Sequence, residues 1–341
     1  MNYLTEFIPI LLQWTTSGQR VTLARVVKTW GSSPRPMGSV MLINENGDVA
    51  GSVSGGCVEG DVIKKAHSVF ETNQSEVVEY GITNEDAWSV GLACGGRLTV
   101  LIENINFTED SFWNELVENI QTDKTSVLIS SLNGPNSASQ LISLDQPSSI
   151  PHDTQFTSWA KEAIDNRKSF IQESSEESFF IQLMPRRSQL IIIGATHIAV
   201  ELIPMAKQLN FETILIDPRS YFIEHTTFKT KPDQLLTAYP SEVLADFTLD
   251  EFTFCAALSH DPKIDDNAFE YLLNKPLAYI GALGSKKSHV QRIQRLIELG
   301  ISKELIDKIH APIGLAIKAK GATEIALSII SQIIATKNQH Q

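Results

Sequence analysis

The stretch from residue 189 to residue 217 constrains the fold more than any other part of this chain. Residues 190–193 are continuously apolar, and apolar residues then recur every three or four positions between residues 199 and 209. Residues 213–216 are again continuously apolar. Two apolar strand patterns joined by an amphipathic helix pattern are typical of a βαβ unit, in a parallel sheet buried on both faces.

Further strand and helix patterns set the expected fold class. Residues 252–258 and 277–280 are apolar runs, each followed by a helix pattern, so we predict an α/β fold with a C-terminal, Rossmann-like parallel sheet domain. Short strand patterns between residues 21 and 102, with helix patterns around them, predict a smaller N-terminal α+β domain.

The domain boundary is expected in a polar segment. A chain of 341 residues is long for a single hydrophobic core. Residues 133–153 are rich in Gly, Asn, Ser and Pro, so we predict an N-terminal domain over 1–132 and a linker region over 133–157. The C-terminal domain is then 158–341, with its core from 189; which domain the patterns at 158–168 and 179–184 pack against stays open.

Charge and composition narrow the partners and the compartment. A formal net charge of -12 at pH 7 offers no general attraction for nucleic acid or an anionic membrane surface. The N-terminus lacks a basic leader pattern and no long apolar run is present, so no membrane span is expected. Three cysteines without a CxxC pair are typical of a reducing compartment, and we expect a cytoplasmic protein.

The turn of the βαβ unit carries a partial nucleotide-binding pattern. Gly194 lies where a pyrophosphate would meet a helix N-terminus, and Asp217 lies where an acid binds a ribose hydroxyl. Thr196 replaces the glycine that lets backbone approach phosphate, which argues against ordinary NAD binding. His197 and Arg219 are candidate anion ligands; the alternatives are a structural histidine and a surface ion pair.

Two more loops are expected at the same edge of the parallel sheet, where ligands of such folds gather. One contains His260 and Asp261, for which the alternative is a loop cap. The other contains Gly281, Gly284 and Ser285, and it leads into a helix pattern with four basic side chains: Lys286, Lys287, His289 and Arg292. Free helix N-terminal amides beside cations predict an anion site, and the alternative is a solvated basic helix face.

The N-terminal domain contains two glycine-flanked cysteines. The first stands in a loop before a helix pattern, within the candidate cofactor-binding set Ser54, Gly55, Gly56, Cys57 and Glu59. Because the positive end of a helix dipole favours a thiolate, Cys57 is the candidate reactive thiol. The second group is Cys94, Gly95 and Gly96. The alternative for both cysteines is a small core residue at a glycine turn.

These motifs together resemble the XdhC/CoxI family, accessory factors of xanthine dehydrogenase and carbon monoxide dehydrogenase. The matching segments are residues 31–38, 54–59, 94–96, 217–219, 259–261, 281–285 and 312–315. The resemblance implies a protein that transiently binds the molybdenum cofactor, assists its sulfuration and delivers it to a xanthine dehydrogenase-type molybdenum hydroxylase, working with a cysteine desulfurase. The residues themselves agree with this role, because a thiolate at Cys57 is suited to protect or ligate the molybdenum centre. Thr196 departs from the family, which usually has glycine there.

Three functions remain to be distinguished. The first is a cofactor chaperone rather than a stand-alone catalyst, which we expect to form a homodimer. The second is an NAD(P)-dependent oxidoreductase, suggested by Asp217 and Arg219. The third is a protein-binding scaffold whose Rossmann-like domain has lost its ligand, suggested by Thr196. The first hypothesis depends on Cys57 and the sheet edge around Gly194 and Gly284 meeting at one cavity.

Overall fold

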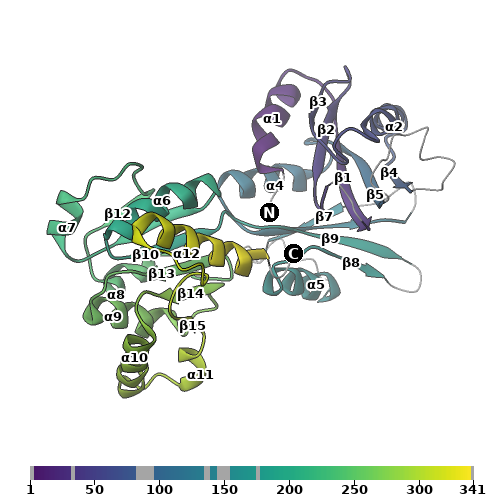
Figure 1. The fold of residues 1–341 in the computed structure, drawn as a ribbon. Coiled ribbons are helices and arrows are strands. Elements are labelled where there is room, and N and C mark those ends of the chain that lie inside the picture. The colour runs from purple at the N-terminus through teal and green to yellow at the C-terminus, as the bar shows by residue number, and fades with distance from the viewer. Residues whose placement is uncertain are drawn as a thin grey trace. The chain divides into compact units, whose positions relative to one another are not determined.

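The computed structural model describes residues 4–31, 35–81, 96–133, 139–143, 154–173 and 177–338, and its fold is drawn in Figure 1. The chain divides into two compact units, Met1–Arg186 and Arg187–Gln341. Within the described ranges, no helix combines the length and the apolar character needed to cross a membrane.

The first unit is built on an antiparallel sheet with the strand order β3-β2-β1-β5-β4. Its strands are β1 (Val21–Trp30), β2 (Val40–Asn44), β3 (Val49–Gly51), β4 (Glu76–Tyr80) and β5 (Arg97–Ile105). Apolar side chains of α2 (Glu59–Thr72) pack on one face, against Ala24, Val26 and Val100. The other face is covered by η1 (Thr5–Phe7), α1 (Ile8–Thr16) and α4 (Ser111–Gln121).

A second sheet, with the order β7-β6-β9-β8, completes this unit. Its elements are β6 (Ser126–Ser131), β7 (Ser139–Ile142), β8 (Phe170–Glu173), β9 (Ser178–Met184) and α5 (Thr154–Asp165). Because β9 pairs with β6, the chain up to Arg186 belongs to the first unit. The division after Arg186 therefore differs from the linker expected at 133–157: a polar stretch marks a surface connection, but it does not reveal which strands pair across it.

The second unit contains a six-stranded parallel sheet, as predicted, with the order β12-β11-β10-β13-β14-β15. Its strands are β10 (Gln189–Ile193), β11 (Glu212–Ile216), β12 (Gln234–Leu236), β13 (Thr253–Ala257), β14 (Tyr279–Ala282) and β15 (Ile309–His310). Every residue of β10, β13 and β14 is buried, which explains the continuously apolar pattern.

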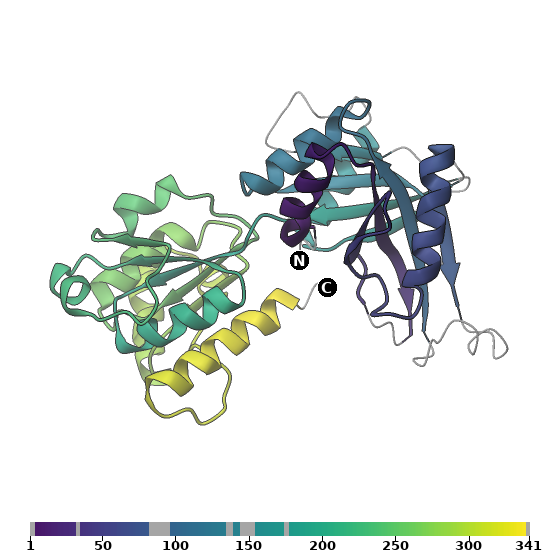
Figure 2. The ribbon, with the colours of Figure 1, turned by 90° about the horizontal axis from the view of Figure 1, so that it is seen from above.

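Helices cover both faces of this sheet, and Figure 2 shows the two helical layers from above. One face packs against α6 (His197–Gln208) and α12 (Gly321–Asn338), which contact each other. The opposite face packs against α9 (Pro262–Leu272), α10 (Lys286–Glu298) and shorter helices. The short helices of the unit are α7 (Ser220–His225), α8 (Pro240–Val243), η3 (Leu244–Asp246) and α11 (Lys303–Ile306).

The strand order reverses between β10 and β13, and this pair defines the ligand-binding edge in doubly wound sheets. The loops after the two strands are in close contact. A Cβ atom on Gly194 would lie 2.5 Å from the Cα of Ser259, and Gly194 has φ +105°. Only glycine satisfies both demands, so Gly194 is required for the backbone packing of this edge.

Candidate functional site

The loop between β3 and α2 folds around its own carboxylate. Glu59 is the first residue of α2, and its side chain turns back over residues 52–56. Its Oε1 accepts from the Ser52 hydroxyl at 2.6 Å, from the Ser54 amide at 2.9 Å and from the Gly55 amide at 3.0 Å. Its Oε2 accepts from the Gly56 amide at 2.9 Å and from the Ser54 hydroxyl.

These hydrogen bonds make Glu59 an internal anion. Burial opposes its ionisation, but the donors from Ser52, Ser54 and the loop backbone lower its pKa from 4.5 to about 2. Gly55 and Gly56 have φ +80° and +119°, so both adopt the left-handed region that allows their amides to converge on the carboxylate. The predicted set 54–59 is therefore assembled, with Glu59 holding the loop rather than facing outward.

Cys57 is a free, half-buried thiol at the rim of this loop. Its amide donates to the Ser54 hydroxyl at 3.0 Å, and its side chain packs against the cluster beneath α2. A Cβ atom on Gly55, Gly56 or Gly60 would meet nothing within 4 Å, so open backbone adjoins the thiol. Cys57 is thus neither sealed in the core nor fully exposed.

The second cysteine group falls mostly outside the described residues. Cys94 and Gly95 are not described, and Gly96 is buried immediately before β5. Cys255 lies within β13, completely buried, and burial raises the pKa of its thiol. In the part of the chain that the structure describes, no group of three or more His, Cys, Asp or Glu residues is arranged to hold a metal ion.

Asp217, predicted to bind a ribose hydroxyl, is completely buried and fully engaged by protein donors. Its Oδ1 accepts from the amide and the Nε of Arg219, both at 2.9 Å. Its Oδ2 accepts from the Ala195 amide at 2.7 Å and from the Nη2 of Arg219 at 2.8 Å. A carboxylate offers about four acceptor positions, so none is left for a ribose.

This pairing determines the charge state of both side chains. Burial opposes ionisation of Asp217, but the hydrogen bonds from Arg219 and Ala195 hold its pKa below the ordinary value. Arg219 is in turn fixed: its Nη1 donates to the Ser259 carbonyl at 3.4 Å, and its guanidinium lies over the Phe222 ring at 4.3 Å. Arg219 therefore forms an ion pair with the buried Asp217 and itself stays partly exposed at the sheet edge.

Thr196 has a local role that the glycine pattern did not reveal. It is the N-cap of α6, and its hydroxyl accepts from the Ala199 amide. His197 is exposed at the first position of the helix. The helix N-terminus is thus capped by a side chain at the position where a usual dinucleotide-binding turn has its second glycine.

The loop after β13 is held by hydrogen bonds to two acidic side chains of α9 and its cap, one of which, Asp265, is buried. Asp261 caps α9 by accepting from the Lys263 amide, which matches the loop-cap alternative. Ser259 donates to Asp265 at 2.6 Å and accepts from the Asp261 amide. His260, between them, is exposed with φ +60°. Asp265 was not predicted as a site residue. The sequence signal that could have identified it is an acidic residue in the first turn of an amphipathic helix, on the face that packs inward.

The loop after β14 ends in a capped helix N-terminus. Gly281 is a packing residue, because a Cβ atom there would lie 2.5 Å from the Tyr279 hydroxyl. Ser285 is the N-cap of α10 and accepts from the Ser288 amide. Arg292, two turns into α10, is buried and donates its Nη2 to the Leu283 carbonyl at 2.9 Å.

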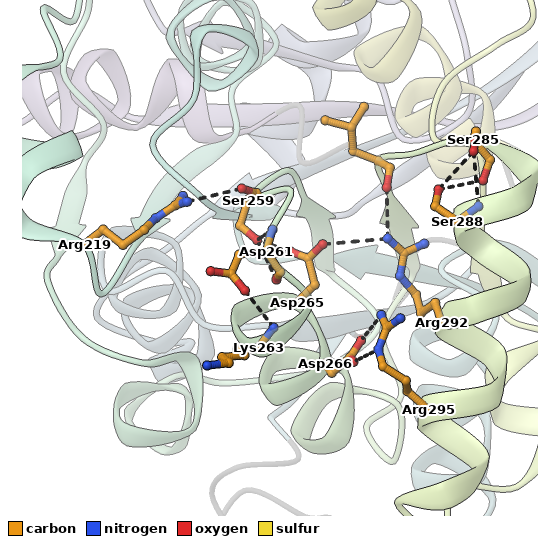
Figure 3. Close-up of polar contacts among 11 residues, drawn as sticks. Arg219, Ser259, Asp261, Lys263, Asp265, Asp266, Ser285, Ser288, Arg292 and Arg295 are labelled. Atoms are coloured by element: carbon orange, nitrogen blue, oxygen red, sulfur yellow. Dashed lines mark hydrogen bonds and ion pairs between the residues drawn. The ribbon is translucent and has the colours of Figure 1, made fainter.

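These contacts connect three strand-end loops into one polar network, which Figure 3 shows. Arg219 contacts the Ser259 carbonyl, Ser259 donates to Asp265, and Asp265 lies 3.7 Å from Arg292. The strand-end loops that contain the predicted residues Arg219, Asp261 and Gly284 are therefore linked at one edge of the sheet. Arginines occupy both ends of the network, with Asp261 and Asp265 between them.

Comparison with known proteins gives matches over both units. A model described as the XdhC Rossmann domain matches residues 190–333, and a model described as the XdhC and CoxI family matches residues 14–81. A Bacillus subtilis protein, named as a probable subunit of xanthine dehydrogenase, is 26% identical over 94% of this chain and 94% of its own length.

Two further relatives also extend over nearly the whole chain. The molybdenum cofactor insertion chaperone PaoD from Escherichia coli is 23% identical and covers 94% of this chain and 85% of its own length. A crystal structure described as a xanthine dehydrogenase from Bacillus halodurans matches with a TM-score of 0.70 and 27% identity, over 98% of this chain and 96% of that one.

Proposed function

Since this chain belongs to the XdhC and CoxI family, we propose that it is an accessory factor that binds the molybdenum cofactor and assists its insertion into a xanthine dehydrogenase-type molybdenum hydroxylase. The proposal includes assistance in sulfuration of the cofactor, a cysteine desulfurase as partner, and a homodimer as the working form. The cofactor is cargo in this role, and its molybdenum chemistry is used by the client enzyme.

The observation that carries the proposal is the extent of the similarity to a named insertion chaperone. That similarity covers 94% of this chain and 85% of the chaperone, so it includes both the cysteine-bearing unit and the Rossmann-type unit. A match confined to the Rossmann-type unit would support the fold alone.

The residues present fit the chemistry of such a cargo. A pterin phosphate is an anion, and the second unit supplies helix N-termini and the fixed guanidinium of Arg219 along one sheet edge. Thiolate is a soft ligand suited to heavier transition metals, and Cys57 is a partly accessible thiol beside open backbone. We assign anion binding to the second unit and protection of the metal centre to Cys57.

The geometry favours this role over the NAD(P)-dependent alternative. A dinucleotide held in the usual way needs a carboxylate for its ribose hydroxyls, and Asp217 has its acceptor positions filled by Arg219 and Ala195. Ribose binding would require breaking a buried ion pair. The scaffold alternative differs from the proposal only in lacking a bound cofactor, so cofactor analysis separates the two.

The test is analysis of the full chain purified from a host that makes the cofactor. We expect pterin, measured by fluorescence after oxidation, and molybdenum, measured by mass spectrometry, in comparable molar amounts. Cys57→Ser should lose molybdenum more than pterin, whereas Ser17→Ala, an exposed surface change at the end of α1, should lose neither. Protein that carries neither group yet captures a component of a hydroxylase would refute cofactor binding and favour the scaffold.

A further inference from the structure

The N-terminus of α10 concentrates positive charge without a matching acid. Lys286 and Lys287 are the first two residues of the helix, both are exposed, and the first turn contains no acidic residue. The helix dipole adds partial positive charge at the same end, where cations are unfavourable and anions are stabilised. The neighbouring helix α9 has the usual arrangement, with Asp265 in its first turn and Asp261 as its cap.

A second, independent feature lies beneath this turn. The Arg292 side chain is only 6% exposed, and its Nε and Nη1 have no hydrogen-bond partner among the residues that the structure describes. Most N–H donors of the guanidinium are therefore buried and unsatisfied. Buried donors in native proteins nearly always have partners, so two unpartnered nitrogens on one buried guanidinium point to an anionic ligand.

Protein acids do not supply what Arg292 lacks. Its nearest carboxylate oxygen, Asp265 Oδ2, lies 3.7 Å from Nη2, which is beyond hydrogen-bonding range. Asp265 is also engaged by Ser259, and burial raises the pKa of its carboxyl. The contrast with Arg295 is direct: one turn further along α10, Arg295 makes two hydrogen bonds to the Asp266 carboxylate.

The Arg292 guanidinium reaches the turn between β14 and α10 through its Nη2, and its unpartnered donors are the other two nitrogens, Nε and Nη1. Arg292 donates Nη2 to the Leu283 carbonyl, and a Cβ atom on Gly284 would lie 3.9 Å from the same nitrogen. That Cβ would also lie 2.5 Å from the Ser288 hydroxyl, so Gly284 is bordered by both side chains. Figure 3 shows Ser285 and Ser288 on the side of the guanidinium away from Asp265.

We infer that the β14–α10 turn is a phosphate-monoester site, in which Arg292 supplies charge-assisted hydrogen bonds from below and the Lys286 and Lys287 amides and side chains bind from above. A phosphate dianion at the turn would offset the charge of the three cations together and give the buried guanidinium an anionic partner. The anion site itself does not depend on the proposed function. Only the identity of the molecule that carries the phosphate rests on that function, and we assign this molecule as the pterin cargo.

The first experiment uses inorganic phosphate and the full chain freed of cargo, followed by calorimetry and ³¹P NMR. The wild type should bind phosphate saturably. The surface variant Lys286→Gln/Lys287→Gln should bind about 5-fold more weakly, because each exposed cation near a helix end contributes modestly. Arg292→Lys keeps the charge but loses the planar fork, and should bind at least about 10-fold more weakly.

Lys263→Gln is the matched control, because Lys263 is an exposed lysine in the first turn of α9, which is capped by Asp261. Its phosphate affinity should stay within about twofold of the wild type. Failure of the wild type to bind phosphate up to about 10 mM, or equal affinity in Lys286→Gln/Lys287→Gln, would overturn the site even if Arg292→Lys misfolds.

The second experiment asks which molecule carries the phosphate. Phosphate should displace copurified pterin from the wild type, and Lys286→Gln/Lys287→Gln should retain less pterin than Lys263→Gln. Saturable phosphate binding with unchanged pterin retention would overturn the assignment to the cargo while leaving the anion site standing. Pterin that copurifies although phosphate does not bind would leave the proposed function standing without this site.

Discussion

Replacing Glu59 by Gln tests whether an internal carboxylate shapes the loop that carries Cys57. Gln keeps the size of the side chain but removes its charge and turns one acceptor into a donor. One oxygen can still serve Ser54 and Gly55, while the new NH₂ group opposes the Gly56 amide, which donates to Oε2 in the native loop. The loop therefore loses part of its hydrogen bonding without losing packing volume.

The size of the effect follows from the pKa of Glu59. A shift from 4.5 to about 2 corresponds to about 3 kcal/mol of preferential stabilisation of the charged form. Because the carboxylate is partly open to solvent, screening reduces this to about 1–2 kcal/mol for opening of the loop. Since 1.4 kcal/mol is a factor of ten, amide exchange in the loop should accelerate about 5- to 30-fold.

Hydrogen exchange read by mass spectrometry on peptides spanning residues 50–62 measures this opening. The wild type should also lose protection as the pH falls from 4.5 towards 2, because the folded-state pKa lies below the unfolded value and protonation removes the stabilisation. Glu59→Gln should show no such pH step. Glu71→Gln, an exposed change on the same helix, is the control. Unchanged exchange in Glu59→Gln would refute the role of Glu59 in holding the loop.

Three further substitutions probe the sheet edge, and a fourth, Gly60→Ala in α2 of the first unit, is a control. Asp217→Asn should destabilise the second unit by about 2–3 kcal/mol in urea titration, because it leaves Arg219 partly unpaired at a buried carboxamide; micromolar NADH binding by the wild type that Asp217→Asn abolished would contradict this account. Gly194→Ala should cost about 3 kcal/mol or more, since its Cβ would collide with Ser259, whereas Gly60→Ala should stabilise by up to about 1 kcal/mol. His260→Gly should leave the melting temperature unchanged or raise it, because His260 has φ +60°, and a pronounced drop would show that its side chain supports the fold.

The site loops were predictable in position but only partly in role. Glycine turns and strand ends are local features, so the positions of Cys57, Gly194, Asp217 and Ser285 at loops or strand ends were predicted from the sequence. The role of Asp217 was read from a pattern of other dinucleotide-binding turns. Its acceptor positions are instead filled by Arg219 and by the amide of Ala195, in the turn after β10. The sequence pattern does not show which donors reach the carboxylate.

The sequence by itself determined the parallel sheet of the second unit, because continuous apolar runs and three-to-four spacing report directly which faces are buried. The helix caps at Thr196 and Ser285 also act within one turn, but the glycine and strand-end patterns did not identify these residues as caps. Only the tertiary structure decided that β9 pairs with β6. It also decided that Arg292 is buried with one nitrogen donating to the Leu283 carbonyl and two nitrogens without a partner. Pairing of strands and burial of a charge depend on segments brought together by folding, and no local pattern specifies the partner.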